Sequence, residues 1–112
     1  IKFRSKLEVY CYKQLKKHNI NIEYESITFT ILESFKYKNK TIRKMTYTPD
    51  FIGDNFIIEC KGYMNDAFPL RWKLFKYFLY KNKMEIDLYL PRNQTEVDKM
   101  VLEIIKLRNA QQ

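Results

Sequence analysis

The sequence predicts an α/β domain with a small mixed β-sheet flanked by helices. Helical patterns open and close the chain, a third lies between them, and strand-like segments fill the intervals. The 112 residues fit one domain, and an apolar fraction of 46% with only 2 Gly and 3 Pro is typical of a globular one. We expect residues 1–112 to form a single domain and, because the first residue is Ile rather than Met, to belong to a longer protein.

The first expected element is a helix from Ser5 to about His18. Apolar residues recur at every fourth position, which is the spacing of a helix face packed on a core. These residues are Leu7, Cys11 and Leu15. We expect this stripe to be buried and the lysines of the segment to lie elsewhere on the helix surface.

Strands are expected next. Residues 22–32 and 35–47 are rich in Ile, Thr, Tyr and Phe and partly alternate, and the loop at 38–40 indicates that they pair as a hairpin. The tight-turn signal at 53–55 predicts a second hairpin, whose later strand covers residues 56–60.

A second helix is predicted from Asp66 or Pro69 to Lys81, with Pro69 in its first turn. One of its stripes consists of Leu70, Leu74 and Phe78. A second stripe, at positions i, i+3 and i+7, consists of Trp72, Phe75 and Leu79. Such a stripe is more typical of a buried core than of a platform on which bases stack. A strand over residues 85–90 and a closing helix after the break at 91–93 complete the order α, β, β, β, α, β, α. The closing helix has a stripe formed by Val97, Val101, Ile104 and Arg108.

The pattern that points to chemistry lies in residues 47–62. Asp50 precedes Glu59 across a predicted turn, and Lys61 follows two positions later. Because side chains alternate along a strand, Glu59 and Lys61 share one face, while Ile58 and Cys60 share the other. A hairpin would bring Asp50 next to Glu59, which is the arrangement of a metal-dependent nuclease centre. The alternative is a turn residue at position 50 and an exposed ion pair between Glu59 and Lys61.

Phosphodiester hydrolysis needs charge neutralisation at the phosphate and a more acidic water, both of which a hard divalent cation supplies. Mg2+ prefers oxygen ligands, so Asp50, Glu59 and the backbone carbonyl of Cys60 are candidate ligands. Lys61 could orient the attacking water and stabilise developing negative charge. Two interpretations of Glu8 stay open. It could fix the start of the helix as part of the capping box Ser5-Lys6-Leu7-Glu8, or it could be a further metal ligand.

The charge balance favours a polyanionic partner. Lys and Arg total 21 against 13 Asp and Glu, which gives a net charge of +8. Candidate phosphate contacts on DNA are Arg4, Lys6, Arg71, Lys73 and Lys76. The alternative is a basic surface that serves solubility only.

The remaining signals bound the setting of the protein. Cys11 and Cys60 lack the spacing of a zinc site and are interpreted as core residues in a reducing compartment. The only histidine, His18, receives no role. Neither a signal peptide nor a membrane-spanning run is visible, so we expect an intracellular, cytoplasmic protein with no membrane partner.

Three stretches resemble the phage endonuclease I family, the Holliday-junction-resolving branch of the PD-(D/E)XK nucleases. The first is Phe3-Arg4-Ser5-Lys6-Leu7-Glu8. The second combines Lys13-Gln14-Leu15 with Ile22-Glu23-Tyr24-Glu25. The third runs from Tyr47-Thr48-Pro49-Asp50-Phe51 to Glu59-Cys60-Lys61-Gly62. Together they cover roughly the first 60 residues.

The resemblance implies a restriction-endonuclease-like fold and an active site made of Glu8, Asp50, Glu59 and Lys61. It also implies two Mg2+ or Mn2+ ions in the site, and an intertwined homodimer in which Glu8 acts in cis or in trans. A phage-encoded protein would act in the host cytoplasm. The expected function is a Mg2+-dependent endonuclease that hydrolyses phosphodiester bonds in branched DNA. The alternatives are a restriction, homing or repair endonuclease, and a catalytically silent nucleic-acid-binding module.

Overall fold

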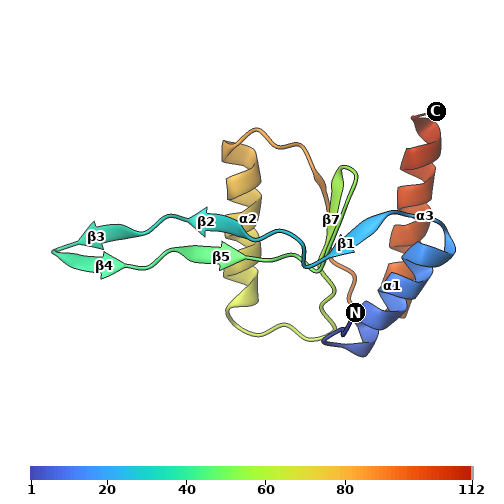
Figure 1. The fold of residues 1–112 in the computed structure, drawn as a ribbon, viewed down its shortest axis with the longest axis horizontal. Helices are drawn as coiled ribbons and strands as arrows, with labels where there is room; N and C mark the ends of the chain where they lie inside the picture. The colour runs from blue at the N-terminus through green and yellow to red at the C-terminus, as the bar shows by residue number, and fades with distance from the viewer. Residues whose placement is uncertain (112) are drawn as a thin grey trace.

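A computed structural model describes residues 1–111 of the chain, and Figure 1 shows its fold. Three α-helices and eight short strands follow one another along the sequence. In chain order they are α1 (Lys6–Lys17), β1 (Ile22–Tyr24), β2 (Phe29–Leu32), β3 (Phe35–Tyr37), β4 (Lys40–Ile42), β5 (Met45–Tyr47), β6 (Phe51–Gly53), β7 (Phe56–Ile58), α2 (Phe68–Lys81), β8 (Asp87–Tyr89) and α3 (Gln94–Ala110). The predicted α/β class and all three predicted helices are confirmed.

The central sheet has four strands in the order β1-β6-β7-β8. The β1–β6 and β6–β7 pairs are antiparallel and the β7–β8 pair is parallel, so the sheet is mixed, as predicted. Strands β6 and β7 form the expected hairpin, and Asn55 in its turn has a φ of 63°. Helix α2 supplies the crossover that the parallel β7–β8 pair requires.

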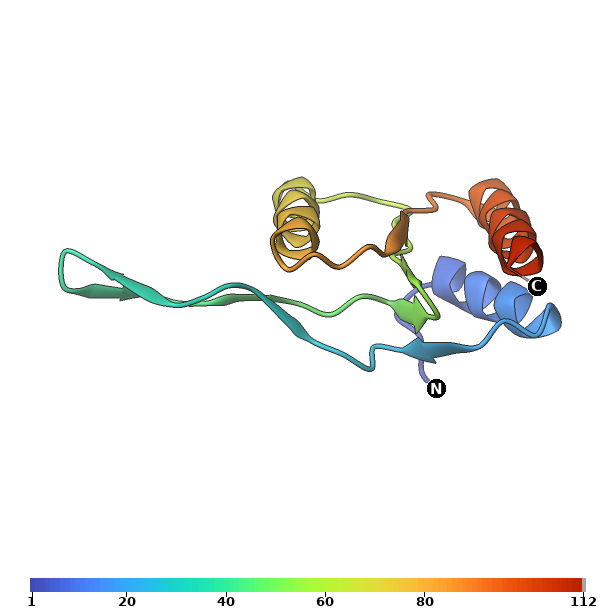
Figure 2. The same cartoon turned by 90° about the horizontal axis from the view of Figure 1, so that it is seen from above.

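Helices cover both faces of this sheet, as Figure 2 shows. Helices α1 and α3 pack on one face around a buried cluster that includes Cys11, Leu15, Ile58 and Cys60, and α2 packs on the other around Ile57 and Trp72. All three residues of β7 are buried, because this strand lies between the two clusters. Both cysteines are free and buried, which confirms the prediction of core residues, and contact with Cys11 and burial raise the pKa of the Cys60 thiol.

A long two-stranded hairpin leaves the body of the protein, and we call residues 29–47 the arm (Figure 1). Its inner part is the β2–β5 pair and its outer part is the β3–β4 pair, turning at Lys38 and Asn39. Both turn residues have positive φ, which suits the tight turn of a hairpin. The predicted loop at 38–40 is confirmed as the hairpin turn. The prediction of one strand over 35–47 is wrong, because β3 and β4 within that range pair with each other and only β5 pairs with the segment before it.

The prediction for the preceding segment is also wrong in extent. Residues 22–32 do not form a single strand, because the chain leaves the main sheet after Tyr24 and enters the arm only at Phe29. The break follows from pairing: Tyr24 lies opposite Phe51 of β6, and Glu25 then adopts a φ of 47° that redirects the backbone.

Helix α2 confirms the core interpretation of Trp72, Phe75 and Leu79, which are all buried. Of the predicted stripe of Leu70, Leu74 and Phe78, the last two pack against the core cluster, whereas Leu70 is 57% exposed. The side chain of Asn65 accepts from the backbone N–H of Phe68, the first residue of the helix, at 2.9 Å. No helix among residues 1–111 is long and apolar enough to cross a membrane.

Gly53 is the position where the fold tolerates a side chain least. A Cβ there would overlap the ring of Phe56, its cross-strand partner. That ring is buried, packs against Tyr89 and borders a cavity of about 180 Å³, so an added methyl group would have to displace it from its contact with Tyr89. We expect Gly53→Ala to lower the free energy of unfolding by about 1–3 kcal/mol, as overpacking of a core does. Urea unfolding followed by circular dichroism measures the loss.

The matched control is Gly62→Ala, because the nearest atom to a Cβ at position 62 is the Arg92 carbonyl oxygen at 3.9 Å. This variant should unfold at the wild-type urea concentration. Equal stability of the two variants would contradict the overlap argument.

Candidate active site

A cleft of about 460 Å³ lies between the start of α1, the base of the arm and the start of α2. It brings together the four residues that the sequence singled out: Glu8, Asp50, Glu59 and Lys61. Glu8 comes from α1, Asp50 precedes β6, and the other two follow β7. The three carboxyl groups belong to buried residues, and the lysine is partly exposed.

Asp50 is held by the strand that carries Glu59. Its Oδ2 accepts from the backbone N–H of Cys60 at 2.8 Å, so the β6–β7 hairpin fixes the carboxylate in the cleft. Burial, followed by the negative charge of Glu59, raises the pKa of Asp50 to about 8. A buried carboxyl with a raised pKa is a group whose negative charge lacks full compensation within the protein.

Glu59 and Lys61 leave the strand on one face, as alternation predicted, and lie 3.5 Å apart between Oε2 and Nζ. The hydroxyl of Tyr47 donates to Glu59 Oε1 at 2.5 Å, so both carboxylate oxygens are oriented. Burial raises the pKa of Glu59, while Tyr47 and then Lys61 oppose the rise. The Lys61 ammonium also lies 5.0 Å from the ring centre of Phe68. The predicted ion pair thus exists, but its carboxylate is buried in a cleft rather than exposed.

Ser5 caps α1 through Glu8, although the Glu8 carboxylate bonds to the Ser5 hydroxyl and not to the Ser5 N–H of a capping box. The role of Glu8 as a metal ligand stays a prediction. The backbone N–H of Glu8 donates to Ser5 Oγ at 3.1 Å, which makes Ser5 the N-cap of α1. Its carboxylate accepts from the Ser5 hydroxyl at 2.9 Å and from the Tyr24 hydroxyl at 2.6 Å. The same carboxylate lies in the cleft, so capping and participation in the site are compatible.

Glu25 was missed as a site residue. One carboxylate oxygen each from Glu8, Glu25 and Asp50 lie within 4.8 Å of one another. The backbone N–H of Glu25 donates to the carbonyl of Asp50 at 2.9 Å, which ties the end of β1 to the start of β6. An acidic residue at a strand end was visible in the sequence, but its neighbours depend on the β1–β6 pairing.

The predicted phosphate contacts divide into two groups. Arg4 and Arg71 line the cleft: Arg4 pairs with Glu25 at 3.1 Å, and Arg71 donates to the carbonyl of Thr46. The remaining three are exposed and lie outside the cleft lining; they are Lys6, Lys73 and Lys76. The cleft therefore has acidic groups in its centre and three cationic groups at its margin, Lys61 being the third.

The donor set suits a hard divalent cation, because carboxylate oxygens gather where burial disfavours their charge. Glu8, Glu25 and Asp50 provide the tightest group, and Glu59 lies near enough to raise the pKa of Asp50. Of Cys60, the backbone N–H is the group bonded in the site, and its carbonyl stays a predicted ligand.

Comparison with known proteins adds one match. Residues 1–91 match the family DUF1064, described as protein of unknown function. The chain belongs to the DUF1064 family. No curated protein and no solved structure gives a significant match. The matched region contains every residue of the acidic cleft, whereas α3 lies beyond it.

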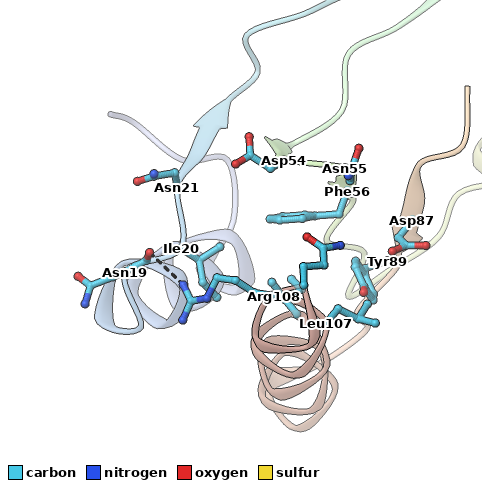
Figure 3. Close-up of a pocket in the computed structure, with 12 residues that line it drawn as sticks. Asn19, Ile20, Asn21, Asp54, Asn55, Phe56, Asp87, Tyr89, Leu107 and Arg108 are labelled. Atoms are coloured by element: carbon cyan, nitrogen blue, oxygen red, sulfur yellow. Dashed lines mark hydrogen bonds between the residues drawn. The ribbon is translucent and has the colours of Figure 1, made fainter.

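A second cavity, of about 180 Å³, lies between the end of α1, the β6–β7 turn and α3 (Figure 3). Its margin includes Asp54 and Asp87, and the side chain of Arg108 donates to the backbone carbonyls of His18 and Asn19 at 3.4 and 3.3 Å. These contacts fasten α3 to α1. The lining of this cavity shares no residue with the acidic cleft, and part of it belongs to α3, which lies outside the DUF1064 match. We therefore interpret the cavity as a gap in the packing between α1, α3 and the sheet.

Proposed function

We propose that the protein is a divalent-cation-dependent DNA endonuclease with a PD-(D/E)XK-type active site. The observation that carries the proposal is the convergence of Glu8, Asp50, Glu59 and Lys61 in one cleft. They come from three separate segments, and the last two follow β7 with the spacing Glu-x-Lys and form an ion pair. An ion pair that forms by chance on a surface would not be accompanied by three buried carboxyl residues in the same cleft as the lysine.

Asp50, Glu8 and Glu59 would hold the cation together with Glu25, which belongs to the tightest group of carboxylates. The cation is Mg2+ by preference, with Mn2+ able to replace it. A bound cation neutralises charge on the scissile phosphate and makes water more acidic. Hydrogen bonds hold three of these carboxylates in place before any ligand arrives. The donors are the Tyr24 hydroxyl to Glu8, the Tyr47 hydroxyl to Glu59 and the Cys60 N–H to Asp50. Such preorganisation reduces the cost of ordering the site during the reaction.

Lys61 has the position of a charge stabiliser. Its ammonium lies beside Glu59 at the mouth of the cleft, where it can orient the attacking water and stabilise negative charge that develops on the phosphate. Arg4 and Arg71 would then position the flanking backbone phosphates, since contacts of this kind fix the register of DNA without reading bases.

The resemblance to the phage endonuclease I family supports a more specific substrate. On that basis we propose that the preferred DNA is branched, such as a four-way junction, and that the active form is a cytoplasmic homodimer. A chain with a net charge of +8 would suit contacts with backbone phosphates, which do not read sequence directly.

The test is cleavage of an end-labelled four-way junction and a matched linear duplex, each with Mg2+, Mn2+ or EDTA, resolved on a denaturing gel. The expected result is metal-dependent paired cuts near the branch. Equal cutting of the linear duplex would favour a restriction or repair endonuclease. Salt-dependent binding without cutting in either metal would overturn the enzymatic proposal and favour a silent binding module.

The two roles of Glu8 can be separated by paired variants. Ser5→Ala removes the cap of α1 and should cost about 1 kcal/mol of stability while the folded protein still cleaves. Glu8→Gln keeps an acceptor for the Tyr24 hydroxyl but removes the charge, so cleavage should fall while the melting temperature changes little. Rates and melting temperatures of both variants provide the check. A Glu8→Gln variant that is less stable but fully active would reduce Glu8 to a capping residue.

A further inference from the structure

The outer part of the arm has no packing partner in the described chain. Every residue from Leu32 to Lys44 is exposed, whereas the inner part packs beneath α2 through Phe29 and Tyr47. We call residues 32–44 the distal arm. A bare two-stranded hairpin is at most marginally stable in water, so a projecting one is more typical of a contact element than of a structural one.

Charge on the distal arm has one dominant sign. It carries a single acidic residue, Glu33, and five basic residues. The basic residues are Lys36, Lys38, Lys40, Arg43 and Lys44. None of them has an ion-pair partner among residues 1–111, in contrast to Arg4 and Lys61 in the cleft. Much of the net charge of +8 is therefore concentrated on a projecting hairpin.

The arm also has a suitable reach. It starts at the cleft, because Thr46 and Tyr47 of β5 line both. From Tyr47 to Lys38 the chain is extended, which at about 3.3 Å per residue gives roughly 30 Å. That distance is close to one helical turn of duplex DNA, about 34 Å. The long axis of the molecule, 52 Å, accommodates a cleft at the body and a contact at the tip.

We propose that the distal arm binds the sugar-phosphate backbone along a groove of duplex DNA, about one turn away from the phosphate held in the cleft. A two-stranded ribbon fits the major groove in width, and its exposed cations provide the phosphate contacts. This inference names the duplex beside the cut as the partner and rests on the proposed function for the position of that cut.

A second copy of the chain is the competing occupant. Phe35 and Ile42, cross-strand neighbours on one face of the distal arm, are 48% and 39% exposed and could pack against protein. The opposite face carries Lys36 opposite Thr41, and basic residues surround the turn. Five unpaired cations would repel an identical arm, so charge favours the nucleic acid.

The test compares two fourfold neutralised variants. The arm variant carries glutamine at positions 36, 38, 40 and 43, and the control carries glutamine at Lys13, Lys17, Lys99 and Lys106, which are exposed on α1 and α3. Both lose the same charge. Binding of fluorescein-labelled duplex is measured by anisotropy in Ca2+ across a salt series.

The arm variant should bind at least about tenfold more weakly, and its salt slope should fall by about 3 to 4, since each phosphate contact contributes about 0.9. The control should retain most of the wild-type affinity and slope. The loss of affinity in the arm variant should appear when the duplex extends more than about 10 base pairs beyond the cleft. It should disappear when the duplex extends only about 4 base pairs, because the arm then has no DNA to contact.

These outcomes separate the arm from the active site. If wild-type protein cleaves and the arm variant binds long duplex as well as the control does, the arm inference fails and the nuclease proposal stands. If wild-type protein never cleaves but the arm variant alone loses binding, the nuclease proposal fails and the arm inference is reduced to DNA binding. A wild-type dimer that dissociates in the arm variant, with unchanged DNA affinity, would assign the arm to a second copy and overturn the inference.

Discussion

Asp50→Asn is expected to abolish metal-dependent cleavage, by about 1000-fold or more, because a cation site loses a charged ligand. The asparagine oxygen can still accept from the backbone N–H of Cys60, so the hairpin that carries the site should stay intact. Single-turnover cleavage of the junction at saturating Mg2+ measures the loss. Wild-type rates in this variant would remove Asp50 from the site and with it the nuclease assignment.

The same variant should be more stable than the wild type when metal is absent. The pKa of Asp50 rises from an ordinary value of 3.8 to about 8 in the folded protein, so the folded state holds a proton that the unfolded state releases. The stability that this group contributes is fully present below pH 3.8 and is lost as the pH rises towards 8. In EDTA at pH 8, Asp50→Asn should therefore melt at a higher temperature, by roughly 5 °C.

Both predictions for Asp50→Asn share one control variant. Asp54→Asn, in the exposed turn of the same hairpin, removes the same charge outside the cleft and should change neither cleavage nor melting temperature. Mg2+ should raise the melting temperature of the wild type and of Asp54→Asn, but not of Asp50→Asn. A uniform response of all three proteins to Mg2+ would place the cation elsewhere.

Lys61→Met is expected to lower the cleavage rate by about 100- to 1000-fold while the cation still binds. Methionine keeps the length of the side chain beside the Phe68 ring but removes the ammonium next to Glu59. Because Lys61 opposes the rise in the pKa of Glu59, that pKa should rise further in the variant. Cleavage should then require a higher pH, which a pH–rate profile measures.

The control for this variant is Lys73→Met, which removes an exposed lysine of α2 outside the cleft. It should cleave at close to the wild-type rate. Loss of Mg2+-induced stabilisation in Lys61→Met would mean that the lysine shapes the cation site rather than the reaction.

Much of the fold follows from local patterns. Helix α1 begins after its Ser5 cap, and the alternation after β7 places Glu59 and Lys61 on one face and Cys60 on the other, as the sequence predicts. Such features depend on neighbours a few residues apart, which periodicity and capping can report.

The rest depends on contacts between distant segments. The pairing of β1 with β6 joins residues about thirty positions apart, and no local pattern distinguishes it from a continuation of β1 into the arm. Glu25 was missed for the same reason, since its closeness to Asp50 arises only from that pairing. The exposure of Leu70 is likewise decided by where α2 rests on the sheet.

The position of the arm within the chain divides the candidate active site into two halves. Glu8 and Glu25 come before it, and Asp50, Glu59 and Lys61 come after it. A single cut between Lys38 and Asn39, at the exposed tip, would thus produce two fragments with incomplete sets of acidic groups. The activity of such a nicked protein would become a measure of fragment association and would disappear on dilution.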